Sequence, residues 1–81
     1  MNEGDLVEIT YWDHFEGDGE WAQLVSVGFF KSENDRYIYI CREKLIDDGK
    51  EELRERVGIL KSNIISHITL KRGEKITAVM K

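Results

Sequence analysis

The chain has 81 residues and one cysteine, and its 12 basic and 16 acidic side chains leave a formal net charge of −4. This length allows one domain, residues 1–81, with a single small core, and the lone Cys41 excludes an internal disulfide. The acidic balance argues against general binding to duplex nucleic acid, which needs a concentrated basic surface.

The sequence shows neither the pattern of a signal peptide nor that of a membrane-spanning segment. The first ten residues, MNEGDLVEIT, have neither the basic nor the apolar region of a signal peptide, and the apolar runs are too short to span a bilayer. We therefore expect a cytoplasmic protein without membrane partners. A domain this small, without a disulfide or zinc-ligand spacing, often gains stability by oligomerisation.

Strand-like alternation begins at residues 6–12, where Val7, Ile9 and Tyr11 fall on one face. Residues 13–20 carry two glycines and four acidic side chains, which predicts a loop. A second strand is expected at residues 21–31. Gly28 inside it indicates a bulge or a sharp bend, which helps a small sheet curl into a barrel.

A hairpin turn at residues 32–35 and a third strand at residues 37–41 come next. Alternation along the third strand predicts Ile38 and Ile40 in the core and Tyr37 and Tyr39 on the outside.

The segment 50–61 has two interpretations. Asp48 and Glu51 resemble a capping box, and Glu52 stands four residues before Arg56, which suits a helix over residues 50–63. Alternatively, any helix is short and ends at Arg56, a strand covers residues 57–61, and a tight turn leads to a last strand at residues 64–71. Gly58 favours the second interpretation, because glycine costs about 1 kcal/mol inside a helix.

After a turn at residues 72–74, residues 75–80 fit a short edge strand or a tail. The chain has no proline, so exposed strand edges lack one common protection against pairing with another copy.

Several short motifs resemble, in order and spacing, a family of small phage-encoded proteins. They are YWDH at residues 11–14, GDGEW at 17–21, SVGF at 26–29, DRYIYI at 35–40 and ILKSNII at 59–65. The chain departs from the family pattern at Glu20, which is an extra residue, and at Leu60, where proline is frequent. The resemblance implies a mainly β, five-stranded SH3-like or Sm-like barrel with a one-turn helix before the last strand, and it implies no activity.

Only one cluster has ligand-like chemistry. Asp13 and His14, with Asp18 and Glu20 nearby, are weak candidates for binding a divalent metal or for acid–base work, although the same side chains also suit a strand end and its loop. Cys41 is expected to be a buried thiol. His67 is expected on the outer face of the last strand, exposed and inert. We predict neither an enzyme nor a cofactor.

The exposed tyrosines are the other candidate site. Tyr37 and Tyr39, with basic side chains from Lys31, Arg36 and Arg42, would suit base stacking in single-stranded nucleic acid. An interface between subunits would explain the same exposed aromatic residues.

The sequence does not assign a biochemical function. The first hypothesis is a non-enzymatic accessory module that binds itself or another protein. The alternative is a nucleic-acid-binding barrel of the Sm or SH3 type, in the form of an oligomeric ring.

Overall fold

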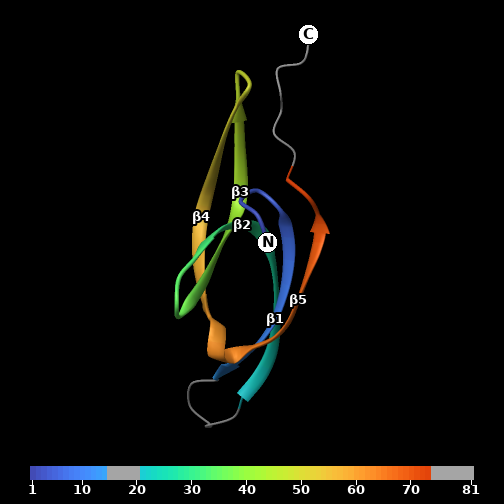
Figure 1. Ribbon diagram of the computed structural model, residues 1–81, viewed down its shortest axis with the longest axis vertical. Coiled ribbons are helices and arrows are strands. Elements are labelled where there is room, and N and C mark those ends of the chain that lie inside the picture. The colour runs from blue at the N-terminus through green and yellow to red at the C-terminus, as the bar shows by residue number, and fades with distance from the viewer. Residues whose placement is uncertain (15–20, 74–81) are drawn as a thin grey trace.

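The computed structural model describes residues 1–14 and 21–73, which form one antiparallel sheet of five strands. The strands are β1 (Leu6–His14), β2 (Trp21–Glu33), β3 (Tyr37–Asp47), β4 (Lys50–Leu60) and β5 (Ile64–Lys71), and the one-turn 3₁₀ helix η1 (Lys61–Asn63) joins β4 to β5. Their order is β4-β3-β2-β1-β5, and the sheet curls strongly without closing (Figure 1). The mainly β prediction is therefore confirmed, and among residues 1–14 and 21–73 the strands β4 and β5 are two separate edges. The edge strand or tail expected at residues 75–80 lies outside the described residues.

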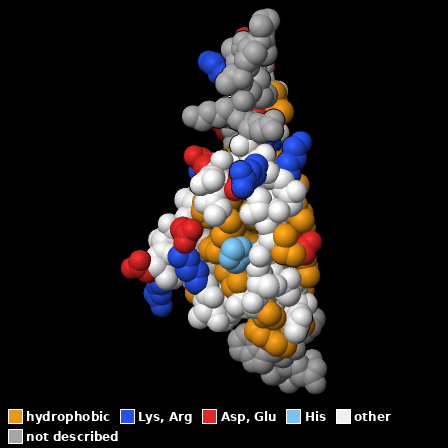
Figure 2. Space-filling model, turned by 45° about the vertical axis from the view of Figure 1, so that its right-hand side comes forward, with side chains coloured by type: hydrophobic (Ala, Val, Ile, Leu, Met, Phe, Trp, Pro, Cys, Tyr) orange, Lys and Arg blue, Asp and Glu red, His pale blue; other side chains and the backbone are white. Residues whose placement is uncertain are grey.

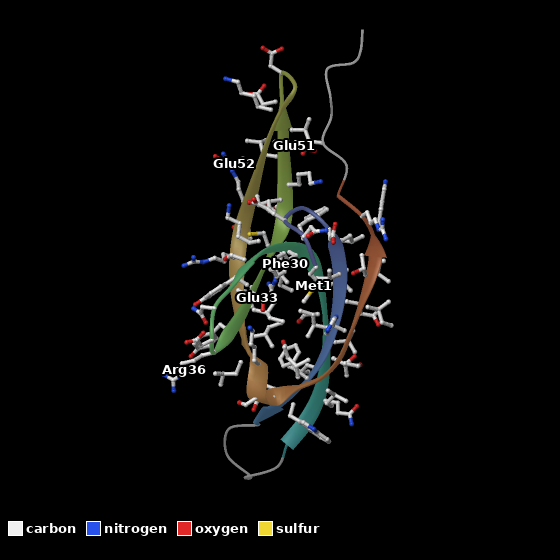
Figure 3. The ribbon with its side chains drawn as sticks, viewed as in Figure 1. Met1, Phe30, Glu33, Arg36, Glu51 and Glu52 are labelled. Atoms are coloured by element: carbon white, nitrogen blue, oxygen red, sulfur yellow. The ribbon has the colours of Figure 1, made fainter. Side chains whose placement is uncertain are left out.

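The inner face of the curled sheet holds the core. Its fully or nearly fully buried apolar side chains come from β1, β2, β3 and β4: Val7, Ile9, Phe30, Ile38, Ile40 and Ile59. Ile38 and Ile40 are buried as the alternation predicted. Met1 is partly buried and packs against this cluster (Figure 3). Each such side chain contributes about 1.5–3 kcal/mol by leaving water.

Gly28 allows a close approach between strands rather than forming a bulge. It pairs in continuous register with Val7 of β1, and a Cβ at this position would lie 2.8 Å from the carbonyl oxygen of Cys41. The irregularity predicted at Gly28 lies instead between Phe30 and Ser32, where the β2–β3 register shifts. The missing side chain therefore lets β3 pass close to β2 just before the bulge.

Residues 50–56 belong to a strand, so the helical interpretation was wrong; the alternative, which allowed at most a short helix before residue 57, placed the start of the strand too late. β4 pairs with β3 from Tyr37↔Leu60 to Asp47↔Lys50, and Asp48 (φ 51°) and Gly49 (φ 80°) form the two-residue connection. Two consecutive positive φ angles are typical of the type I′ hairpin turn that Asp-Gly favours. The predicted strand from Val57, the turn at Lys61–Asn63 and the last strand are confirmed.

The distal half of the β3–β4 hairpin, residues 42–56, is a two-stranded arm. The pairing between β2 and β3 ends at Phe29↔Cys41, so beyond that point β3 pairs only with β4. Figure 1 shows the arm projecting past the other strands. Leu45 and Ile46 on it are exposed.

The two ends of the described chain meet at Asp5, a buried carboxylate. Its Oδ2 accepts a hydrogen bond from the backbone N–H of Asn2 at 2.9 Å, and its Oδ1 accepts one from that of Gly73 at 2.8 Å. The backbone of Gly4 and Asp5 also bonds Phe30 of β2. Asp5 thereby holds the N-terminal turn against the residues that follow β5.

Candidate functional site

Tyr37 and Tyr39 lie together on the outer face of β3. Their ring centroids are 5.8 Å apart, and the ring planes are inclined by 28°. The ring of Tyr39 covers Gly58, its partner on β4, because a Cβ there would lie 3.0 Å from the Tyr39 Cε1 atom. Because Gly58 has no side chain, the Tyr39 ring packs directly over the backbone of β4.

Arg56 completes this group, which we call the aromatic strip: Tyr37, Tyr39 and Arg56. The Arg56 guanidinium carbon lies 4.8 Å from the centroid of the Tyr39 ring, within cation–π range. Sequence reasoning missed Arg56, because its position beside Tyr39 follows from the β3–β4 register and neither interpretation placed residue 56 in a strand. The Asp48-Gly49 turn is the signal that would have revealed it.

The three basic residues predicted to accompany the tyrosines are placed differently: Lys31 lies near enough to Arg56 for their charges to interact, whereas Arg36 lies in a turn and Arg42 on the other face. Lys31 binds Glu3, with Nζ 2.9 Å from Oε2, and this carboxylate raises the pKa of Lys31. Arg36 sits in the β2–β3 turn, where its backbone N–H donates to Asn34 Oδ1, and its side chain points away from the sheet (Figure 3). Alternation assigns Arg42 to the face opposite Tyr39.

The proposed metal or acid–base cluster is only partly described. Asp13 and His14 belong to β1, opposite Ala22 and Trp21, and not to the loop in which they were predicted. Asp18 and Glu20 lie outside the described residues. Within residues 1–14 and 21–73, no group of three or more His, Cys, Asp or Glu side chains is arranged to hold a metal ion.

The predictions for Cys41 and His67 fared differently. Cys41 is a buried free thiol, as predicted. His67 pairs with the core residue Ile9, which places it on the inner face of β5, so the outer-face prediction was wrong. It remains exposed because β5 is an edge strand.

The base of the arm carries an open hollow of about 430 Å³, lined by Glu43, Lys44, Leu45 and Arg54. Its cations are engaged: Arg54 Nε lies 2.7 Å from Glu52 Oε2, and Lys44 Nζ lies 3.6 Å from Glu51 Oε1 and 4.6 Å from the centroid of the Phe29 ring. This pairing favours a structural role for these charges.

The β5 edge combines exposed apolar side chains with a strand edge that no other described strand covers. Ile65, Ile68 and Leu70 are 45%, 55% and 49% exposed. Two strands away, Val27 is 47% exposed and belongs to the same row across the sheet, Val27–Glu8–Ile68. Figure 2 shows hydrophobic side chains over the centre and right of this side, while most charged side chains in the view lie toward its left and upper margins.

Among the residues that the structure describes, no helix has the length and apolar character needed to cross a membrane. No model of a protein family, no curated protein and no solved structure matches the chain.

Proposed function

We propose that this chain is a non-enzymatic, protein-binding module of the SH3-like class that works by self-association. The strand order β4-β3-β2-β1-β5 and the one-turn helix η1 between β4 and β5 support the fold class. The curled sheet supplies a scaffold, and the β5 edge supplies the contact surface.

The observation that carries the proposal is the exposure of apolar side chains along the free β5 edge. From Ile65 to Lys71 every residue of β5 is exposed, and three of these residues are large and aliphatic. Burying apolar surface yields about 25 cal/mol per Å², so association would cover a costly surface. A second copy of the same chain can cover this surface, because every copy carries the same β5 edge.

Stability supports the same conclusion. Among the described residues, the core cluster contains six buried apolar side chains, and the single cysteine is a free thiol. Domains of this size gain little from the core alone and often use association to supply the remainder.

The test is the molar mass in solution, measured by light scattering over a hundredfold range of protein concentration. We expect a mass above that of one chain at high concentration. Ile68→Lys should lower the mass to that of one chain and leave the fold intact, because residue 68 is exposed and faces Glu8 across the sheet.

A matched control is available on the arm. Ile46 is 58% exposed and faces Glu51, as Ile68 faces Glu8. Ile46→Lys therefore adds a positive charge opposite a glutamate, as Ile68→Lys does, but far from β5. Its mass should equal that of the wild type. A wild-type chain that is monomeric at every concentration contradicts the proposal.

The aromatic strip supports a second candidate function, binding of single-stranded nucleic acid. Stacked tyrosines with an adjacent arginine resemble the surfaces on which such strands place successive bases. Fluorescence anisotropy with labelled oligonucleotides tests this: Tyr37→Ala with Tyr39→Ala should weaken binding at least tenfold, and Tyr39→Phe, which keeps the ring, should not. Absence of binding by the wild type at low salt rejects this candidate.

A further inference from the structure

Within the part of the chain that the structure describes, the two edge strands of the sheet, β4 and β5, differ in how well they are protected against pairing. β4 carries six charged residues among its eleven: Lys50, Glu51, Glu52, Arg54, Glu55 and Arg56. Glu55 also has a φ of 63°, which interrupts the extended backbone. Charges and irregular backbone are the devices by which natural edge strands resist pairing. The β4 edge is therefore guarded.

The β5 edge has few of these protections. Its only lysine or arginine is Lys71 at its end, it has no proline, and no acidic residue occurs between Lys61 and Gly73. Shifts in the β1–β5 register lie near both ends of β5 and leave a regular stretch, residues 66–69, that pairs with Thr10, Ile9, Glu8 and Val7. In such a stretch alternate backbone N–H and C=O groups point away from β1 toward the free side.

We infer that β5 pairs antiparallel with β5 of a second copy of this chain, so that two curled sheets join into one across a two-fold axis. The inference rests on the proposed self-association and assigns its geometry. With the axis perpendicular to the sheet, outward side chains of one copy meet outward side chains of the other. Ile68 of each copy thereby lies at the seam.

A second copy fits this edge better than a charged partner does. Residues 64–70 carry no lysine, arginine or acidic side chain, so two copies bring no like charges of these types together at the centre of the seam. Lys71 stands at the end of the strand, and an antiparallel arrangement keeps the two Lys71 side chains at opposite ends. A charged strand would instead lose hydration there without an ionic partner.

Hydrogen exchange of the backbone amides, followed by NMR at low and high protein concentration, tests the pairing. We expect alternate amides within residues 66–69 to become at least tenfold more protected at high concentration. The amides of β4 that point away from β3 should exchange at the same rate throughout.

Val27→Lys separates edge pairing from stacking of the outer faces. Val27 lies on β2, about 10 Å from β5 at about 4.8 Å per strand, and faces Glu8. Edge pairing predicts that Val27→Lys keeps the wild-type mass while Ile68→Lys loses it. If the wild type assembles but the β5 amides stay unprotected, or if Val27→Lys dissociates it, edge pairing is overturned and self-association stands. If the wild type is monomeric, both fail.

Discussion

A side chain at Gly28 or at Gly58 would collide with a neighbouring group, and the two neighbouring groups differ in how easily they can move. At Gly28 the nearest obstacle to a Cβ is backbone, the Cys41 carbonyl oxygen at 2.8 Å, with the Ile40 side chain at 3.2 Å. At Gly58 the obstacle is the ring of Tyr39 at 3.0 Å, on the outer face of the sheet. A ring can shift into solvent, whereas a strand in the middle of the sheet cannot move without breaking its pairing.

The same substitution at the two glycines should therefore have unequal effects. Gly28→Ala should lower the free energy of unfolding by about 1–3 kcal/mol, the usual cost of overpacking. Gly58→Ala should change it by less than about 1 kcal/mol, because the strain is offset by the smaller entropy of the unfolded chain. Urea denaturation of both variants checks this, and equal losses would show that β3 yields as readily as a side chain.

Asp5 stabilises the fold in its ionised form. The backbone N–H groups of Asn2 and Gly73 donate to its carboxylate and hold its pKa below the ordinary value. The folded-state pKa thus lies below that of the unfolded chain. The stabilisation is present above the unfolded pKa and is lost as the pH falls through the folded value.

We expect Asp5→Asn to weaken the fold at pH 7 and to flatten its acid sensitivity below about pH 4. The amide keeps one acceptor oxygen, but its NH₂ group replaces the second acceptor. Asp35→Asn, at an exposed turn position, removes the same charge and serves as the control. Urea midpoints measured from pH 7 to pH 2.5 decide the question: a constant difference between Asp5→Asn and the wild type over this range would contradict the assignment.

At the scale of elements, the arm depends on its turn more than the body of the sheet does. A hairpin without a third strand is marginally stable in water. The turn at Asp48 and Gly49 therefore sets the register of the arm, including the position of Arg56 beside Tyr39.

Gly49→Ala should unfold the arm locally. A φ of 80° costs a residue with a Cβ about 1–2 kcal/mol, whereas Gly49→Asn should be better tolerated, because asparagine adopts this conformation more readily. Amide exchange measured by NMR should accelerate in residues 43–54 of the alanine variant and remain unchanged in β1 and β2. Equal acceleration throughout the sheet would mean that arm and body unfold as one unit.

The elements differ in how far local sequence could predict them. Period-2 alternation was sufficient for β1 and for the inward Ile38 and Ile40, because one face of these strands is buried. It also located β2, although Val25 and Val27 of its alternating apolar face are exposed. It failed over residues 50–56, where the spacing of Glu52 and Arg56 suits a helix face as well as an exposed strand. The aromatic strip was therefore predicted in part: its tyrosines follow from alternation, and its arginine follows from register.

Because the curled sheet is open, exposed apolar side chains and unpaired backbone groups gather at the β5 edge. The β4 end is charged and forms the arm, while the β5 end is apolar and has a regular central stretch. A closed sheet would have no such asymmetry, because it has no edges. Association at β5 would leave the outer face of β3, with the aromatic strip, free for another ligand.

Association of this kind makes stability depend on protein concentration. For a dimer that dissociates on unfolding, each tenfold rise in protein concentration adds about 1.4 kcal/mol per mole of dimer to the free energy of unfolding. The thermal midpoint of the wild type should therefore rise over a hundredfold range of concentration, and that of Ile68→Lys should not. The wild-type rise should persist in 1 M salt, where the screening length is about 3 Å, because residues 64–70 have no lysine, arginine or acidic side chain. Calorimetry at three concentrations and two salt levels makes the comparison: a midpoint independent of concentration contradicts association, and a concentration effect lost in salt would show that charges outside β5 hold the copies together.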